Sequence, residues 1–378
     1  AGALSSGNIQ VDRQHLERPG TVIIDGEPDD ELRAALASWA RAATSGGNHF
    51  WGQLSHAGRQ TPKTVNPHPG APSAVRLQLP GGQFGAPVAM SLQDIERTVQ
   101  RFGTAAAACR DAGFTGVEIH SAHGYLLSEF LSPRANLRTD KYGGELPNRA
   151  RLLLEVFAAV RAAVGPGFPV AVKLNSADFQ KGGFEFEESL QVAVWLQEAG
   201  VDLIEVSGGT YEQPKLVGLE GIEPEADQKV KPSTLMREAY FADFAVAMRE
   251  RVSVPLMVTG GFRKRAAMEQ AIESGGADLI GIGRPMCVDV DAPSRLLAGL
   301  EELNRYERDL SLLPGWLSFL TRIPLVRSVS GFSSMYWFYA QLYALARDGA
   351  PQPDLSVFEG AKRVLSSENK LLRSLRDA

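Results

Sequence analysis

Cysteine is scarce in this chain of 378 residues, which contains only Cys109 and Cys287. Two thiols cannot build a disulfide framework, and an iron–sulfur cluster needs about four thiolates. A reducing compartment such as the cytoplasm fits this cysteine content best. We expect no bound metal.

An excess of positive charge is also missing, because 39 Lys and Arg stand against 44 Asp and Glu, a net charge of −5. This mild acidity argues against a nucleic-acid partner, which would select a basic stripe. Long apolar runs are absent as well. The closest is 312–346, which Arg322, Pro324 and Arg327 interrupt, so we expect no membrane span. The first seven residues lack the basic flank and apolar centre of a signal peptide.

A third absence concerns glycine. No Gly-x-Gly-x-x-Gly opens a helix after the first strand-like run, which disfavours an open, doubly wound dinucleotide-binding sheet. What the chain does contain is a series of short apolar runs bounded by Gly, Pro or polar residues, as expected of parallel strands buried on both faces. These runs are 48–54, 116–120, 169–174, 202–206, 255–259 and 278–282, with residues 1–7 as the remnant of a seventh.

The segments between these runs have helical patterns. Residues 92–112 follow Ser91, which with Asp94 forms a capping signal, and further helices are predicted at 148–164, 186–199, 239–251 and 264–274. Repeated βα units predict an α/β fold with right-handed crossovers, here a TIM (β/α)8-type barrel of which seven strands are visible. We assign residues 1–290 to the barrel.

Two other regions stand out. Residues 55–90 form a Pro- and Gly-rich loop that is too long for a plain connection, so we expect it to be functional. Residues 291–378 are predicted to be a helical extension packed on the barrel, rich in aromatic residues between Trp316 and Tyr343. These aromatic side chains either pack against the barrel or form an oligomer interface or a partial lid over the site.

The residues whose side chains could take part in catalysis or binding lie at the carboxyl ends of predicted strands. This end is the catalytic face of a parallel barrel. His120, His123 and Tyr125 end or follow the run 116–120. Two imidazoles and a phenol in this position can hold a carbonyl oxygen and deliver a proton. At the ends of two later strands, Gly260-Gly261 and Gly283-Arg284 have the glycines and the guanidinium that a phosphate site requires.

Five segments carry a resemblance to a known family. They are Gly7-Asn-Ile-Gln-Val-Asp-Arg13, Gln53-Leu-Ser-His-Ala-Gly-Arg-Gln60, His120 to Gly144, Gly260-Gly-Phe262 and Gly281-Ile-Gly-Arg-Pro285. In this order they resemble the Old Yellow Enzyme family of FMN-dependent NADH:flavin oxidoreductases, or ene-reductases. The resemblance spans nearly all of residues 1–285. Its most specific part is His-x-Ala-His-Gly-Tyr-Leu followed by Asp-x-Tyr-Gly-Gly.

The resemblance implies that the chain binds FMN and takes its reducing equivalents from NADH or NADPH. Gln53 and Lys173 would face the flavin pyrimidine, where a cation stabilises the anionic reduced flavin. The alternative for Lys173 is an interior residue paired with a carboxylate. The phosphate of FMN would be held by the residues of the two late turns, namely Gly260, Gly261, Gly283 and Arg284.

The resemblance also implies a reaction on a small α,β-unsaturated carbonyl compound. His120 and His123 would donate hydrogen bonds to the carbonyl oxygen and so polarise the alkene. Hydride would pass from flavin to the β-carbon, and Tyr125 would protonate the α-carbon as general acid.

Several other residues are given lesser roles. His56, Arg59 and Gln60, in the loop after Gln53, are expected to shape the substrate or nicotinamide pocket. The remaining expectations are that His15 and His68 are surface or loop residues, that Asp140, Tyr142, Gly143 and Gly144 maintain a loop, that Cys109 is buried in a helix, and that Cys287 is inert.

In one respect the chain departs from the family pattern. We find no counterpart of the family's first strand, with its Ala-Pro-Met-like run beside the flavin, in agreement with the count of seven strands. The contrasting hypothesis is therefore a catalytically inactive, flavin-free barrel remnant. A dienoyl-CoA-reductase-like relative is disfavoured, because it needs a cysteine cluster and a following dinucleotide domain. A homo-oligomer is possible on this sequence.

Overall fold

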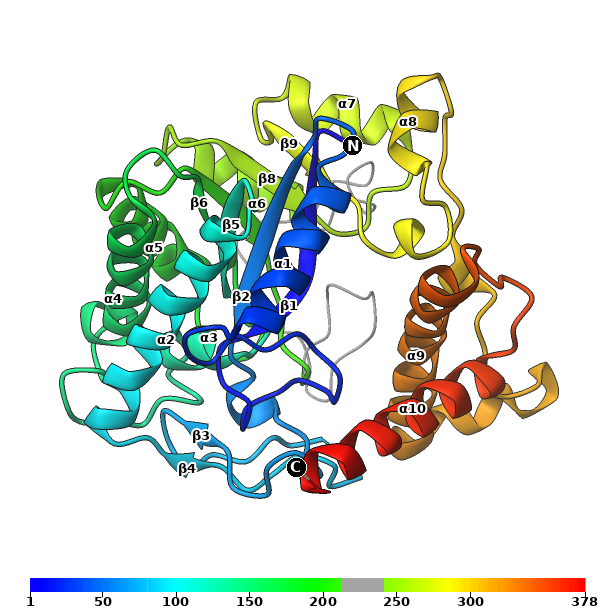
Figure 1. The fold of residues 1–378 in the computed structure, drawn as a ribbon, viewed down its shortest axis with the longest axis horizontal. Helices are drawn as coiled ribbons and strands as arrows, with labels where there is room; N and C mark the ends of the chain where they lie inside the picture. Colours follow the sequence, from blue (N-terminus) through cyan, green and yellow to red (C-terminus); the bar gives the residue numbers. More distant parts are fainter. Residues whose placement is uncertain (80, 213–240, 378) are drawn as a thin grey trace.

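The fold is built on one parallel sheet, seen in a computed structural model that describes residues 1–79, 81–212 and 241–377 (Figure 1). Seven strands pair side by side in the order β1-β2-β5-β6-β7-β8-β9, and every pairing is parallel. The strands are β1 (Ala3–Gln10), β2 (His49–Ser55), β5 (Gly116–Ser121), β6 (Val170–Asn175), β7 (Leu203–Ser207), β8 (Leu256–Thr259) and β9 (Leu279–Gly281). All seven predicted strands are confirmed.

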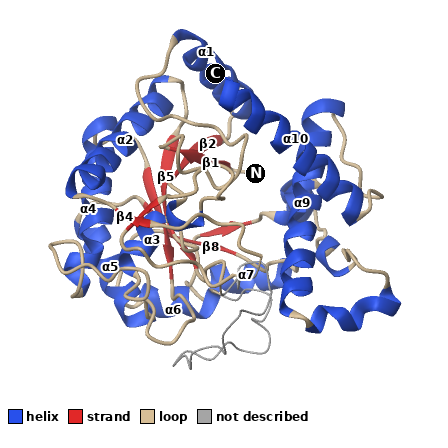
Figure 2. Cartoon of the chain, turned by 90° about the horizontal axis from the view of Figure 1, so that it is seen from below, coloured by secondary structure: helices blue, strands red, loops and turns tan. Residues whose placement is uncertain are grey.

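Helices cover the outer face of this curled sheet. Figure 2 shows α2, α4, α5, α6 and α7 arranged around the strands. The helices of this part of the chain are α1 (Asp30–Ala43), α2 (Leu92–Asp111), α3 (Leu126–Leu131), α4 (Leu146–Val164), α5 (Phe186–Glu198), α6 (Ala242–Arg249), α7 (Arg265–Glu273) and α8 (Ala292–Leu297). The predicted α/β barrel architecture is therefore confirmed, with the strands in sequence order and β1 and β9 at the two edges of the described sheet.

Burial explains why the central strands read as continuous apolar runs. Every residue of β5, β6 and β7 is buried, because helices lie on one face and interior side chains on the other. The edge strand β9 is by contrast exposed or half-buried along its three residues.

The predicted capping signal of α2 is present. The Ser91 hydroxyl accepts from the Asp94 amide, and the Asp94 carboxylate accepts from the Ser91 amide. Cys109 is buried in this helix, as expected. Helix α1 was not predicted, although Asp29 caps it by accepting from the Leu32 amide. The predicted helix 239–251 begins in residues outside the described part, and its remainder forms α6.

The long loop 55–90 contains only short regular pieces. They are the 3₁₀ helix η1 (Gly58–Gln60) and a small parallel pair of strands, β3 (Gly70–Ala71) and β4 (Val88–Ala89). His68 in this loop is exposed, as expected.

The C-terminal region is helical, as predicted. After the 3₁₀ helices η4 (Arg284–Cys287) and η5 (Tyr306–Arg308), it contains η6 (Gly315–Arg322), α9 (Pro324–Asp348) and α10 (Val357–Asp377). In Figure 1, α9 and α10 stand on the opposite side of the molecule from α2 and α4. Their shared core is a second apolar cluster around Trp337, Phe338, Val288 and Val357. None of the helices in the described ranges has the length and apolar character needed to cross a bilayer.

Candidate active site

The carboxyl end of β5 brings together the three residues that the sequence singles out. The ring of His120, which lies in β5, is 5.0 Å from the His123 ring and 4.9 Å from the Tyr125 ring, centre to centre. His123 has a left-handed backbone, with φ of 61°, and its amide donates to Asn175 Oδ1 at 3.0 Å. This strained turn folds His123 and Tyr125 back towards His120.

Both imidazoles are neutral in these surroundings. Burial, followed by the charge of Lys173, lowers the pKa of His123 to about 3. Burial, then His123 and Lys173, holds the pKa of His120 well below its usual range. The Ala122 amide donates to His120 Nδ1 at 3.2 Å, so the ring proton of His120 lies on Nε2. His120 is therefore a neutral hydrogen-bond donor through Nε2.

The Tyr125 phenol lies between a carboxylate and a second phenol. Its hydroxyl donates to Glu17 Oε2 at 2.6 Å and lies 2.8 Å from the Tyr211 hydroxyl. Burial, followed by the charge of Glu17, raises the pKa of Tyr125 well above 10, so the phenol keeps its proton at neutral pH. The Asn8 amide group also donates to Glu17 Oε2, at 2.5 Å.

Sequence reasoning missed Glu17, Tyr211 and Ser207, whose hydroxyl lies 2.6 Å from His123 Nε2. Glu17 follows β1, and the other two end or follow β7. The sequence offers a signal only for Ser207 and Tyr211, because they end or follow a strand, as His120 does.

Beside this trio, charged and polar side chains of four neighbouring strands contact one another. Gln53 on β2 donates to Glu118 on β5 at 2.5 Å, and Lys173 on β6 pairs with Glu205 on β7 at 2.5 Å. Burial raises the pKa of Glu118, and the nearby Glu205 raises it further. Although burial also opposes charge on Glu205, Lys173 lowers the Glu205 pKa to about 2. Of the two carboxyl groups, that of Glu118 is thus protonated and that of Glu205 is ionised.

The Lys173 ammonium is stabilised by the same layer. Burial disfavours its charge, but Glu205 and Glu118 outweigh burial and raise the pKa of Lys173. The alternative anticipated from the sequence, an interior lysine paired with a carboxylate, is thus present in the structure.

The two late glycine turns lie at the ends of neighbouring strands, β8 and β9. Gly260 and Gly261 have φ of 132° and 82°, a conformation that side chains disfavour. A side chain at Gly283 would meet nothing within 4 Å, so the backbone there is open to a ligand. Arg284 opens η4, and its Nη1 lies 3.9 Å from Glu307, which also accepts from Arg263 Nη2 at 2.7 Å.

The loop after β2 supports the trio from the other side. Gln60 donates to the His123 carbonyl at 3.0 Å and accepts from the Tyr211 amide at 3.3 Å. Arg59 is buried and pairs with Glu212 at 2.9 Å. Of the loop residues expected to shape the pocket, Gln60 contacts the trio directly.

A family model described as "NADH:flavin oxidoreductase / NADH oxidase family" matches residues 29–302. The chain belongs to this family. It is 40% identical to the NADH-dependent flavin oxidoreductase iliE of Neonectria sp. over 76% of this chain, but it spans only 39% of that relative's length. It is 33% identical to iccE of Talaromyces variabilis, over 92% of this chain and 87% of the relative.

Solved structures of the family have the same fold. An old yellow enzyme homologue from Zymomonas mobilis matches with a TM-score of 0.65 and 25% identity, covering 83% of this chain and 84% of that one. The resemblance to Old Yellow Enzyme found in the sequence is thereby confirmed. So is FMN, used with a nicotinamide reductant, as the cofactor that this family implies.

The residues present fit FMN. Adjacent strand ends carry the positive-φ glycines and the open backbone at Gly283, and Arg284 supplies a guanidinium at the same end, a combination suited to a phosphate. Lys173 lies in register with His120, and Gln53 in register with Glu118, two residues earlier on the same strand. With FMN bound, the Gln53 amide and the Lys173 ammonium would be the groups available to the flavin ring.

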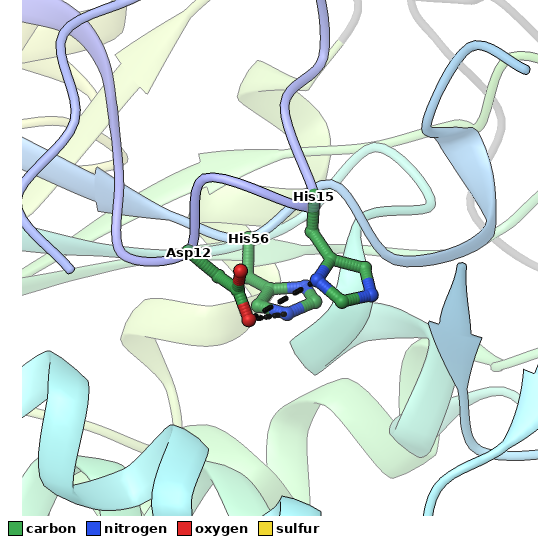
Figure 3. A group of neighbouring side chains, drawn as sticks. All are labelled: Asp12, His15 and His56. Atoms are coloured by element: carbon green, nitrogen blue, oxygen red, sulfur yellow. Dashed lines mark ion pairs between the residues drawn. The ribbon is translucent and has the colours of Figure 1, made fainter. Parts of the chain in front are cut away.

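One further cluster lies beside the trio. Asp12, His15 and His56 are buried together, and their rings and carboxylate face one another (Figure 3). His15 lies in a loop, which is one of the two expected placements, but the residue is buried, at 9% exposed, and its ring stacks on His56 at 4.2 Å. Nothing in the local sequence around His15 marked this burial.

Hydrogen bonds define the protonation of these rings. The Gly70 amide donates to His15 Nε2 at 2.8 Å, and the Gly58 amide donates to His56 Nδ1 at 3.1 Å. Each ring therefore directs its N–H towards Asp12, whose Oδ2 lies 3.2 Å from His15 and 3.9 Å from His56. Rings that present N–H groups do not present metal-binding lone pairs. The Arg101 guanidinium pairs with Asp12 Oδ2, so the guanidinium and the two rings together form a clamp on the Asp12 carboxylate.

Proposed function

We propose that the chain is an FMN-dependent ene-reductase that reduces an activated alkene next to a carbonyl group, with NADH or NADPH as reductant. The observation that carries the proposal is the trio at the end of β5, two neutral imidazoles and a protonated phenol, in which the His120 ring contacts each of the other two. Bound FMN supplies the hydride chemistry. The protein's residues bind, polarise and protonate.

The imidazoles are suited to hold a substrate oxygen. Nε2–H of His120 is a donor that carries no net charge, and it sits in a buried, weakly screened place where such a bond counts most. His123 Nε2 contacts the Ser207 hydroxyl, so this ring donates to substrate once that contact is exchanged. Negative charge that develops on the carbonyl oxygen would be stabilised by both rings.

Tyr125 is suited to supply the proton. Its raised pKa keeps it protonated, and the ring contact with His120 places it beside the oxygen-binding groups. In this role the phenol O–H turns from Glu17 to the α-carbon, and the Tyr211 hydroxyl remains to stabilise the phenolate by a hydrogen bond. Glu17 is a positioning residue, because it acts through Tyr125.

The test begins with the colour of the purified protein and with the release of FMN on denaturation. Stopped-flow spectroscopy then follows bleaching of the flavin by NADH or NADPH and its reoxidation by 2-cyclohexenone. Both steps are expected. A protein that remains colourless after reconstitution with FMN would favour the contrasting hypothesis, a flavin-free chain, for which the exposed edge strand β9 is the supporting observation. A yellow protein that reduces no enone would contradict the substrate class alone.

The cysteines bear on the location of the protein. Cys109 and Cys287 are both free thiols, which supports a reducing compartment such as the cytoplasm.

A further inference from the structure

In the proposed reaction the Tyr125 phenol gives up its proton in each turnover and has to regain it before the next. The residue is only 5% exposed, so its access to water is poor. In the described part of the chain its hydroxyl contacts two other groups, the Glu17 carboxylate at 2.6 Å and the Tyr211 hydroxyl at 2.8 Å. These two groups can return a proton to the phenol without water entering the pocket.

The Glu17 carboxyl group reaches from the phenol to solvent. Its Oε2 accepts from the Tyr125 hydroxyl and from the Asn8 side-chain amide. No residue in the described ranges donates to Oε1, and this oxygen is not buried, so water can reach it. Glu17 as a whole is half-buried. One carboxyl group therefore holds the phenol with one oxygen and faces solvent with the other.

Electrostatics favours rapid return of the proton to this site. When Tyr125 loses its proton, a phenolate lies beside the Glu17 carboxylate in a weakly screened place. Two negative charges so close to each other raise the proton affinity of both groups. Burial and the charge of Glu17 already raise the pKa of Tyr125 well above its usual value. The pair therefore takes up a proton from solvent rather than remaining doubly charged.

Of the two groups in contact with Tyr125, Glu17 is the better proton donor. A carboxylic acid has an ordinary pKa of about 4.3 and a phenol one of about 10, so transfer from a protonated carboxyl group to a phenolate is strongly downhill. Tyr211 is a much weaker acid, and burial raises its pKa further. A relay through Glu17 is therefore favoured over one through Tyr211.

Three further titratable groups lie near Glu17, namely Arg18, Tyr339 and Glu368. Arg18 donates to Glu368 at 3.1 Å and stacks over the Tyr339 ring at 3.9 Å, so these three groups engage one another. Within the described ranges none of them contacts the Tyr125 hydroxyl. They hold the surroundings of Glu17 in place and do not compete with it for the phenol.

On the basis of the function proposed above, we propose that Glu17 relays a proton from solvent to Tyr125 after each reduction of an alkene. The Tyr125 O–H bond breaks as a C–H bond forms at the α-carbon, and the phenol oxygen keeps the electron pair. Hydronium or a buffer acid then protonates Oε1 of Glu17. Rotation of the carboxyl group, about a torsion with a broad and roughly two-fold profile, brings the new O–H to the phenolate. Tyr125 accepts the proton, and Glu17 returns to its ionised form.

The test separates the first turnover from those that follow, using the full chain loaded with FMN. The flavin is reduced anaerobically with stoichiometric dithionite and mixed with 2-cyclohexenone. E17Q should complete this first turnover, since Tyr125 already holds its proton. With excess NADH and enone, E17Q should give a burst of product equal to the flavin present and then a steady rate about 10²-fold slower than that of wild type, because an amide cannot carry the proton. The ultraviolet absorbance of a phenolate should persist after the burst.

Matched variants separate a relay from a structural role. Glu155 accepts from the Tyr142 hydroxyl at 2.8 Å, a pair of the same kind away from the trio, so E155Q should show no burst. E17D keeps a carboxyl group and should recover most of the steady rate. In E17A, added formate or acetate should accelerate the steady rate in proportion to its concentration. A side chain that only held the loop in place would not be replaced in this way by a small free acid.

The outcomes distinguish the relay from the reaction on which it rests. A wild-type protein that completes no first turnover would contradict the proposed function, and the relay with it. If wild type reduces the enone but E17Q shows no burst, or if formate and acetate leave E17A unchanged, the relay alone is wrong. A burst in Y211F and none in E17Q would also overturn it, and would assign the return of the proton to Tyr211.

Discussion

At the scale of single residues, the hydrogen-bond partners of the trio define its chemistry more than its residue types do. Neutral His120 is a donor because the Ala122 amide occupies Nδ1, and Tyr125 is protonated because it is buried beside Glu17. The same reasoning from backbone amides distinguishes a carboxylate clamp at Asp12 from a metal centre.

Replacing Tyr125 with Phe should slow alkene reduction by about 10²-fold or more, because a general acid is removed. Flavin reduction by the nicotinamide should be nearly unchanged, since no proton from Tyr125 is needed there. Stopped-flow measurement of the two half-reactions checks this. Tyr142→Phe is the matched control, because Tyr142 is also buried but donates to Glu155, away from the trio. If both half-reactions slowed equally, the role as proton donor would be wrong.

Replacing Glu17 with Gln should lower the pKa of Tyr125, because the negative charge that raises it is lost. The rate of alkene reduction depends on the protonated phenol, so it should decline at a lower alkaline pH in the variant than in wild type. The pH profile of that half-reaction is the measurement. An alkaline limb at the same pH in both proteins would contradict the contact between Glu17 and Tyr125.

At the scale of elements, the sequence predicts the helices and strands whose apolar periodicity matches the face that they bury. The strands β5 and β6 and the capping box of α2 could be predicted, since each depends on neighbouring residues in sequence. The strand-end position of His120 and Tyr125 was predictable for the same reason. Glu17 was not, because it reaches Tyr125 across 108 residues, and the burial of His15 depends on Gly70 and His56 in a distant loop.

The contact between α3 and η1 gives a prediction of this scale. Glu129 of α3 accepts from the Arg59 amide at 2.8 Å, and burial raises the pKa of Glu129 to about 8, although Arg59 opposes the shift. The pKa of Glu129 is higher in the folded chain than in the unfolded chain, so its protonated form favours folding. This contribution to stability is complete below about pH 4.5 and is lost as the pH rises through 8. The loss amounts to about 1.4 kcal/mol per pH unit between the two values.

The variant Glu129→Gln keeps the neutral shape but cannot ionise. Its free energy of unfolding should therefore rise relative to wild type as pH is raised from 6 to about 9. Urea denaturation at several pH values measures the difference between the two proteins, in which all other titrating groups cancel. Parallel curves would mean that Glu129 is ionised in the folded protein at neutral pH.

At the scale of the whole molecule, the guanidinium of Arg18 links the loop after β1 to the C-terminal helices. Arg18, in the loop after β1, stacks over the Tyr339 ring at 3.9 Å and donates to the Tyr343 hydroxyl at 3.0 Å and to Glu368 at 3.1 Å. Phe332 of α9 also contacts the Tyr211 ring, so α9 reaches the second phenol of the candidate site. These contacts join residues more than 300 positions apart in some cases, which no local pattern reveals.

Replacing Arg18 with Met should therefore destabilise the docking of α9 and α10, because the Met side chain cannot donate to Glu368. Glu368 is 6% exposed, and removing one partner of a buried ion pair costs about 3–5 kcal/mol.

Neutralising the other partner as well, in Arg18→Met with Glu368→Gln, should recover part of that loss, since no unpaired charge is then buried. Urea denaturation of wild type, both single variants and the double variant gives the coupling free energy, expected at about 1–3 kcal/mol. Purely additive effects would mean that Arg18 stabilises the C-terminal helices through Tyr339 and Tyr343 alone. Limited proteolysis between α9 and α10 would then show equal cleavage in the Arg18 single variant and in the double variant.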